Sequence, residues 1–317
     1  MYYISAASTI SHQPTFQNEG FSALIQPLEV SAALISPDYK SFIDAGLLRR
    51  MSKILRMSVA CAKDCLDKAE IEQPGAIIVG TGLGCLTDTE KFLNNALTIE
   101  GLLPPTAFIQ STHNTMAGQI SLSIGNHGYN MTHTQNALSF EHALLDAMLV
   151  LNEGEQNVLV GAADETIDFL AEVASRLQLK LKQETTSGAS FFVISGQKSG
   201  QALACIQDVR TIGLVEDVKS GISTFLNANE ITLQDLDLVL FTGPLHAGND
   251  LFRDMDAAKS QLVDYLDLSG IYPTASAFAM HYAADRMKAN AAIKKVLICN
   301  TLIQSNLGLI LLHSIEA

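Results

Sequence analysis

The sequence has little charge, and few of its charges are positive. Charged residues make up 17% of the 317 positions, and 33 Asp and Glu side chains against 20 Lys and Arg give a formal net charge of −13 at pH 7. Nucleic acids and anionic membranes are bound through clustered Lys and Arg side chains. The composition therefore argues against nucleic acid or membrane as a partner, and against direct docking of an acidic carrier protein on this chain.

Long apolar runs and paired cysteines are also lacking. Without a run of about 20 apolar residues, no transmembrane helix is expected. The first residues, MYYISAAST, lack the basic and apolar segments of a signal peptide. The spacing of the cysteines fits neither a disulfide framework nor a zinc site, so we expect core thiols, no metal and a reducing, cytoplasmic location. The five cysteines are Cys61, Cys65, Cys85, Cys205 and Cys299.

Predicted strands and helices alternate along the chain. Short apolar runs predict buried strands, and apolar residues at spacings of three and four predict helices. This alternation indicates an α/β protein with a mainly parallel sheet covered on both faces. Because the pattern repeats, we expect two similar halves, residues 1–198 and 199–317, in one compact unit. The clearest strands are 75–80, 158–161, 236–241 and 296–300.

Four further segments give more specific structural expectations. One helix is predicted over residues 38–69 and another over 250–267. The segments 190–195 and 203–212 are predicted to be strands that pair as a hairpin across the glycine-containing stretch 196–200.

The stretch from Asn130 to Glu165 is predicted to form a strand, a sharp turn, a buried helix and a second buried strand. A helix that starts directly after a strand is a usual place for a nucleophile in an α/β protein. The turn here, residues 134–137, has the sequence Thr-Gln-Asn-Ala and contains no cysteine. Ser139 is the nearest hydroxyl beyond the turn, but it lies within the predicted helix.

A glycine-rich turn follows the strand at residues 75–80. The sequence GTGLGC, Gly80 to Cys85, could cradle a phosphate between strand and helix. However, Cys85 stands where a dinucleotide fingerprint has its third glycine, and this strand is not the first of the chain. The favoured interpretation is that the glycines let two backbone segments pass close together.

Five segments in the correct order resemble the β-ketoacyl synthases of the thiolase-like superfamily. The resemblance implies a duplicated thiolase-like fold, layered α-β-α-β-α around two mixed five-stranded sheets. It covers nearly the full length and is weaker after residue 200. The segments are RRMSKILRMSVACAKDCLDKA (49–69), AIIVGTGLGCLTDTEKF (76–92), NTMAGQISLSIGNHGYN (114–130), NVLVGAADE (157–165) and TSGASFFVIS (186–195).

The resemblance also locates three catalytic positions, and this sequence fills none of them with the family's residue. A ketosynthase carries its acyl chain on a cysteine at a helix N-terminus and uses two histidines as hydrogen-bond donors. An ungapped count places the cysteine position at Ala137, with Gln135 two residues earlier. The histidine positions correspond to Thr242, in TGPLHAGND, and Phe278, in SAFAMHYAA.

This pattern is similar to the chain-length-factor class, in which a silent ketosynthase-like subunit pairs with an active ketosynthase and shapes its acyl tunnel. The resemblance implies polyketide, fatty-acid-like or aryl polyene synthesis, no cofactor, and an acyl carrier protein bound only indirectly, through the partner. It places Phe92 and Ala96 on the helix that caps the partner's tunnel, although plain core packing of Phe92 is as good an explanation. The strand expected to pair across the heterodimer contains Tyr129, Met131, Thr132, His133 and Thr134.

Two alternatives remain open from the sequence. One is an autonomous acyltransferase or condensing enzyme that uses displaced residues, with His246 and His281 as the best candidates for a shifted pair. The other is a scaffold or regulatory homodimer.

Overall fold

The computed structural model describes the whole chain except residues 180, 182, 243–259, 304 and 316–317. In the described part, ten strands form one hydrogen-bonded sheet with the order β3-β2-β4-β5-β1-β6-β10-β9-β7-β8. The strands are β1 (Tyr2–Ile10), β2 (Ala76–Gly80), β3 (Tyr129–His133), β4 (Asn157–Asp164), β5 (Gly188–Ser195), β6 (Ala204–Gly213), β7 (Leu238–Thr242), β8 (Gln261–Asp264), β9 (Lys295–Asn300) and β10 (Asn306–His313).

The sheet consists of two mixed blocks of strands. Strands β3, β2 and β4 are parallel, and β5 and β1 continue this block in antiparallel fashion. Strands β8, β7 and β9 are likewise parallel, followed by antiparallel β10 and β6. The blocks meet where Tyr2–Ile4 of β1 pairs with Ala204–Ile206 of β6. The mixed five-stranded blocks that the resemblance implies are therefore confirmed, but in the described residues they join into one ten-stranded sheet. The expectation of a mainly parallel sheet was wrong, because five of the nine strand pairings are antiparallel.

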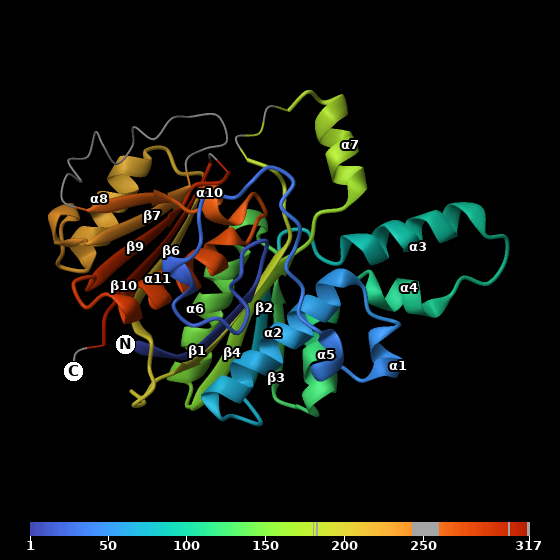
Figure 1. Cartoon of the computed structure of the whole chain (residues 1–317), viewed down its shortest axis with the longest axis horizontal. Coiled ribbons are helices and arrows are strands. Elements are labelled where there is room, and N and C mark those ends of the chain that lie inside the picture. Colours follow the sequence, from blue (N-terminus) through green and yellow to red (C-terminus); the bar gives the residue numbers. More distant parts are fainter. Residues whose placement is uncertain (180, 182, 243–259, 304, 316–317) are drawn as a thin grey trace.

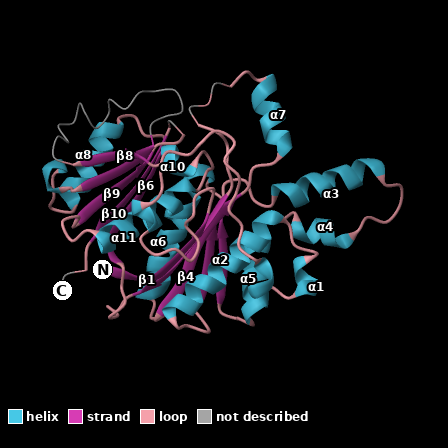
Figure 2. Cartoon of the chain, viewed as in Figure 1, coloured by secondary structure: helices cyan, strands magenta, loops and turns pink. Residues whose placement is uncertain are grey.

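Helices form three layers around the two blocks (Figures 1 and 2). Apolar residues of α2 and α5 pack on one face of the first block, whereas α6 and α11 lie between the blocks and α8 covers the far face of the second. Successive strand residues face opposite layers: Ile77 packs with α2, and Ile78 packs with α6. The helices are α1 (Ala45–Leu48), α2 (Lys53–Ala69), α3 (Leu86–Thr98), α4 (Pro105–Gln110), α5 (Thr115–Ile124), α6 (Ser139–Asn152), α7 (Asp168–Arg176), α8 (Val218–Ala228), α10 (Leu266–Ser269) and α11 (Ala275–Ala289).

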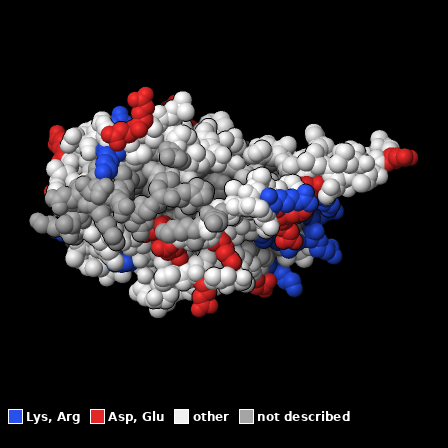
Figure 3. All heavy atoms as spheres, turned by 90° about the horizontal axis from the view of Figure 1, so that it is seen from above, with Lys and Arg blue, Asp and Glu red and all other residues white. Residues whose placement is uncertain are grey.

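Helices α3 and α4 project from the body of the molecule as an arm (Figure 1). The rings of Phe92 and Phe108 pack against each other within it, with centroids 5.4 Å apart. Few charged side chains lie on the face of the arm seen in Figure 3. Its exposed apolar residues are Leu93, Leu97, Ile99, Leu102, Phe108 and Ile109.

Three expectations about secondary structure were wrong. Strands β5 and β6 do not form a hairpin, because β1 lies between them and pairs with both. The predicted helix over 38–69 is broken: Asp44 caps the short α1, and the buried Met51 separates it from α2. Within the described part of 250–267, residues Gln261–Asp264 form the edge strand β8, since they pair with β7 in parallel.

Two further features bear on earlier expectations. All five cysteines are free and buried, in agreement with the expected core thiols. No helix among the described residues is both long and apolar enough to cross a membrane. The boundary between residues 198 and 199 stays a prediction.

Candidate functional site

The turn between β3 and α6 keeps an unusual backbone conformation. After β3 ends at His133, Gln135 leads into a 3-10 turn over Asn136–Leu138, and α6 begins at Ser139. Asn136 has φ of 54°, a left-handed conformation that Asn adopts more readily than most residues. Its neighbour Ala137 is fully buried. Seven described non-glycine residues have a positive φ, so the position of this turn between a strand and a helix N-terminus, and not its backbone angle, makes it the candidate site.

Asn300 connects this turn to the second half of the chain. Its side-chain amide Nδ2 donates to the carbonyl oxygen of Ala137 at 2.8 Å and to Glu141 Oε1 at 2.9 Å. Asn300 is also the strand neighbour of Thr242, and the Thr301 hydroxyl donates to the Thr242 carbonyl oxygen. The structure thus brings two of the predicted positions, Ala137 and Thr242, to the same place.

Glu141 is an acid enclosed by the protein below the turn. The residue is fully buried, and burial raises its pKa to about 6, against the opposing effect of the hydrogen bond from Asn300. Gly308 of β10 lies against it: a Cβ at that position would stand 2.8 Å from Glu141 Oε1 and 2.9 Å from Leu138. A side chain there would collide with both, which explains why a glycine occupies this position.

Phe278 fills the third predicted position with an apolar ring. It is fully buried on α11 in the same core cluster as Ala137, and its ring stacks with that of Tyr282 at 6.5 Å. A phenyl ring has no hydrogen-bond donor. The correspondence of Ala137, Thr242 and Phe278 to the family's catalytic positions stays a prediction, but none of the three carries a thiol or an imidazole.

Two described side chains next to the turn that could serve as nucleophiles, Cys299 and Ser139, are enclosed by the protein. Cys299, which precedes Asn300, is fully buried among the residues that face α8, and burial raises its pKa. The thiolate, which is the reactive form, is therefore disfavoured. Ser139 is also buried, and its hydroxyl lies 2.8 Å from the carbonyl oxygen of Thr81 and 2.7 Å from that of Asn136.

The structure describes only one of the two histidines, His246 and His281, that were candidates for a displaced catalytic pair. His246 lies outside the described residues. His281 is buried on α11, one turn beyond Phe278, and its Nδ1 is 2.8 Å from the hydroxyl of Thr9 on β1. Burial lowers its pKa to about 3. The imidazole is therefore neutral at pH 7, and its partner is not part of the turn.

The glycine-rich turn after β2 holds an internal carboxylate instead of a free phosphate cradle. The buried Asp164 accepts hydrogen bonds from the backbone N–H groups of Gly82 and Leu83 and from the Thr81 hydroxyl. A Cβ on Gly80 would lie 2.5 Å from the Ser139 carbonyl oxygen. Both observations support close backbone packing as the reason for the glycines.

The predicted interface residues lie on the edge strand β3 and just after it. Tyr129 and Met131 are 42% and 40% exposed, and Thr134 and Gln135 are also exposed. Thr132 and His133 are half-buried. Asp146 on α6 orients this strand, because its Oδ2 lies 2.8 Å from His133 Nε2 and accepts from the Tyr129 hydroxyl at 3.2 Å.

The two predicted tunnel residues lie on the projecting arm. Phe92 is half-buried against Phe108, and Ala96 is exposed. Neither belongs to the buried cluster around Ala137. The role of both residues at a tunnel stays a prediction.

Sequence reasoning missed Glu141, Asn300 and Asp164. Glu141 could have been noticed in the sequence. It lies three residues after Leu138 and three before Leu144, on the face of α6 that is predicted to be buried, where an acid is unexpected. Its contact with Asn300 spans 159 residues of sequence and could not be read from local pattern.

Solved structures with the same fold include ketosynthases and ketosynthase complexes. The ishigamide ketosynthase/chain length factor matches with a TM-score of 0.78 at 14% identity, over 99% of this chain and 99% of that chain. A beta-ketoacyl synthase from Burkholderia phymatum STM815 matches with a TM-score of 0.79 at 11% identity, over 99% of each chain. The ketosynthase ApeO in complex with its chain length factor ApeC, from Xenorhabdus doucetiae, matches with a TM-score of 0.53 at 20% identity, over 68% of this chain and 84% of that chain.

Sequence comparison is more specific than these structural similarities. No curated protein matches the sequence. The family model described as the N-terminal domain of beta-ketoacyl synthase matches residues 29–205, which is more than half of the chain and includes the glycine-rich turn, β3 and the N-terminus of α6. The chain belongs to the β-ketoacyl synthase family.

Proposed function

We propose that this chain is a catalytically silent ketosynthase-like subunit of the chain-length-factor type. In this role it pairs with an active β-ketoacyl synthase and shapes the acyl tunnel of that partner. The product would be a polyketide, a fatty-acid-like chain or an aryl polyene. The acyl carrier protein would dock on the active partner, in keeping with the net charge of −13 on this chain.

The observation that carries the proposal is an intact turn without its reactive groups. The left-handed backbone at Asn136 and the start of α6 provide the setting for a nucleophile. Ala137 cannot be acylated, and Phe278 cannot donate a hydrogen bond. The hydrogen bonds of Asn300 and the enclosed Glu141 occupy the space beside the turn and connect the two halves there. The turn therefore leads into a helix N-terminus without a thiol at Ala137 or a hydrogen-bond donor at Phe278, which supports a silent subunit.

The second support is an open, partly apolar surface at one end of the molecule. Strand β3 is an edge strand of the sheet in the described residues, so one side of its backbone is free to pair. Tyr129 and Met131 expose apolar surface on β3, and Leu122 on the adjacent α5 is 76% exposed. Together with the apolar arm, this surface fits a protein partner that buries it.

Neutral His281, bound to Thr9, speaks against the alternative of an autonomous enzyme with displaced residues. A homodimer through the same edge remains the main competitor, because an edge strand can also pair with its own copy.

Co-expression with an active β-ketoacyl synthase from the same organism tests the proposal. We expect a stable heterodimer by size-exclusion chromatography with light scattering. Met131→Lys should abolish it, since a charge would be buried at the centre of the interface. Leu214→Lys is the matched control, because Leu214 is 84% exposed and lies in the other half of the chain, between β6 and α8. If this chain forms a homodimer and does not bind the ketosynthase, the result favours the scaffold alternative.

A further inference from the structure

The seam between the two blocks of strands is hollowed beside β1. A cavity of about 510 Å³ opens there beside β1, the start of β6 and the α11 helix. Its volume is that of a small-molecule site and far exceeds the roughly 30 Å³ share of one water molecule. Strand β1 is four strand positions from β3 in the sheet, or about 19 Å. The cavity is therefore separate from the partner surface proposed above.

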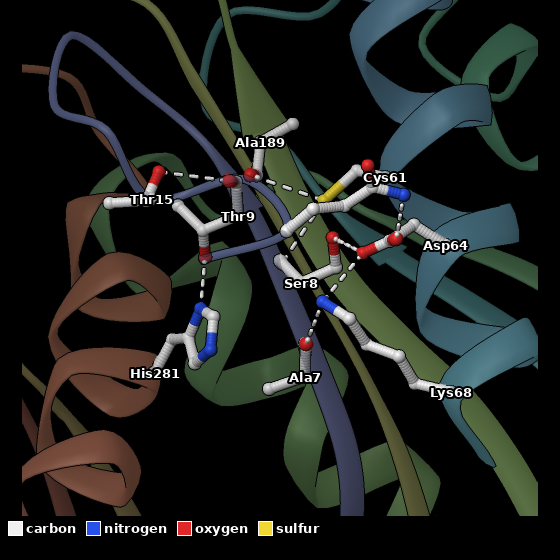
Figure 4. A network of polar contacts seen from close by, with 10 residues as sticks. Ala7, Ser8, Thr9, Thr15, Cys61, Asp64, Lys68, Ala189 and His281 are labelled. Atoms are coloured by element: carbon white, nitrogen blue, oxygen red, sulfur yellow. Dashed lines mark hydrogen bonds and ion pairs between the residues drawn. The ribbon is translucent and has the colours of Figure 1, made fainter. Parts of the chain in front are cut away.

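His281 presents an unused hydrogen-bond acceptor to this cavity. The residue is 8% exposed and lines the cavity wall. Its Nδ1 contacts Thr9 Oγ1 at 2.8 Å (Figure 4). Thr9 in turn donates its single proton to Ser190 Oγ at 2.9 Å. Nδ1 must therefore carry the proton of the neutral ring, which leaves Nε2 as an acceptor. Nε2 has no hydrogen-bond partner among the described residues.

Lys68 provides donors on the opposite side. Its Nζ forms an ion pair with Asp64 at 2.7 Å and lies 3.4 Å from the carbonyl oxygen of Ala7. The Ser8 hydroxyl also donates to Asp64, which fixes the carboxylate in place. Figure 4 shows Lys68 and His281 on either side of Ala7. An ammonium group has three donor protons, so this pairing does not exhaust Lys68.

The charges on the cavity wall balance. Lys68 and Lys288 are offset by Glu19 and Asp285. Glu19 pairs with Lys288 at 3.2 Å, and Asp285 accepts from the backbone N–H groups of Gly20 and Ser22. A wall with balanced charge does not select an anion or a cation. It offers interspersed donors and acceptors, next to the small apolar surfaces of Ala6, Ala7 and Ala202.

We propose that this cavity binds a small, neutral, hydroxylated molecule, a polyol or a sugar. A hydroxyl group is a donor and an acceptor at once, so one hydroxyl can donate to His281 Nε2 while another accepts from Lys68. The alanine side chains can cover the C–H faces of the ligand. An anion would meet Glu19 and Asp285, and a purely apolar ligand would leave Nε2 without a partner.

Nuclear magnetic resonance of the ¹⁵N-labelled full chain tests the proposal. The neutral probes are glycerol, glucose and myo-inositol, and the anionic probes are lactate and phosphate. We expect at least one neutral probe to shift the His281 Nε2 resonance saturably. His281→Asn preserves a group that reaches Thr9 but loses the acceptor, and should weaken binding about tenfold, the loss of one hydrogen bond. His281→Gln, which reaches the Nε2 position, should bind more tightly than His281→Asn.

Three results would overturn the inference. They are the absence of saturable shifts with every neutral probe, saturation by lactate or phosphate in preference to the polyols, and unchanged binding by His281→Asn. Circular dichroism of each variant establishes that it is folded. Heterodimer formation is measured separately, so the two proposals can fail independently.

Discussion

Replacing Glu141 by Gln should make the protein more stable at neutral and alkaline pH. The substitution keeps the size of the side chain and an oxygen that can accept from Asn300. It removes the need to hold an ionised carboxylate in a fully buried position. The effect should depend on pH in a defined direction, because the pKa of Glu141 in the folded chain is raised from 4.5 to about 6.

The sign follows from proton linkage. Between these two pKa values the unfolded chain has released the proton of Glu141 while the folded chain still holds it. The stabilising contribution of the protonated acid is complete below pH 4.5 and is lost as the pH rises through about 6. The shift corresponds to about 2 kcal/mol at 1.36 kcal/mol per pKa unit. Glu141→Gln should therefore gain about 2 kcal/mol relative to wild type between low and neutral pH.

Urea unfolding of both proteins at pH 4.5, 6 and 8 measures this difference in the free energy of unfolding. Glu153→Gln, at the exposed end of α6, is the control for loss of a surface charge and should follow wild type at every pH. A stability difference between Glu141→Gln and wild type that stays constant with pH would refute the reasoning. So would a loss of stability that grows as the pH rises.

The remaining predictions concern the turn, its glycine neighbour and the arm. Gly308→Ala should lower the free energy of unfolding by about 1–3 kcal/mol in urea titrations, because its methyl group would press on Glu141 and Leu138; wild-type stability would contradict this close packing. Ala137→Cys should not confer condensation of malonyl-carrier substrate, measured by mass spectrometry, since Phe278 still lacks a donor; turnover would show that other groups suffice. Ala96→Phe should shorten the acyl chain of the partner's main product without weakening the complex, whereas Ala96→Ser should leave the product length unchanged. Equal product lengths from the two variants would show that the arm does not limit the depth of the tunnel.

Much of the fold could be predicted because its signals are local. The apolar run at β2 and the three-and-four spacing of α6 are visible in the sequence, and their alternation indicates a layered α/β protein. The position of β1 between β5 and β6 was missed because antiparallel pairing over about 190 residues leaves no local pattern. The edge strand β8 was missed because its four residues continue an apolar spacing that also fits a helix.

The candidate site was only half visible for the same reason. Resemblance located Ala137, Thr242 and Phe278 one by one, and the absence of cysteine in the turn was plain. The side chains that contact these positions could not be predicted. Asn300 joins Ala137 and Glu141 from a strand far along the chain, and only the packed structure brings these groups together.

The central claim is that this chain performs no chemistry and acts through a ketosynthase partner. The most direct test compares the products of an active ketosynthase from the same organism alone, this chain alone and the purified complex, with malonyl-carrier substrate and mass spectrometry of the released acyl chains. We predict no turnover by this chain alone, and products of a defined length only from the complex. Turnover by this chain alone, or an identical product distribution with and without it, would contradict the account.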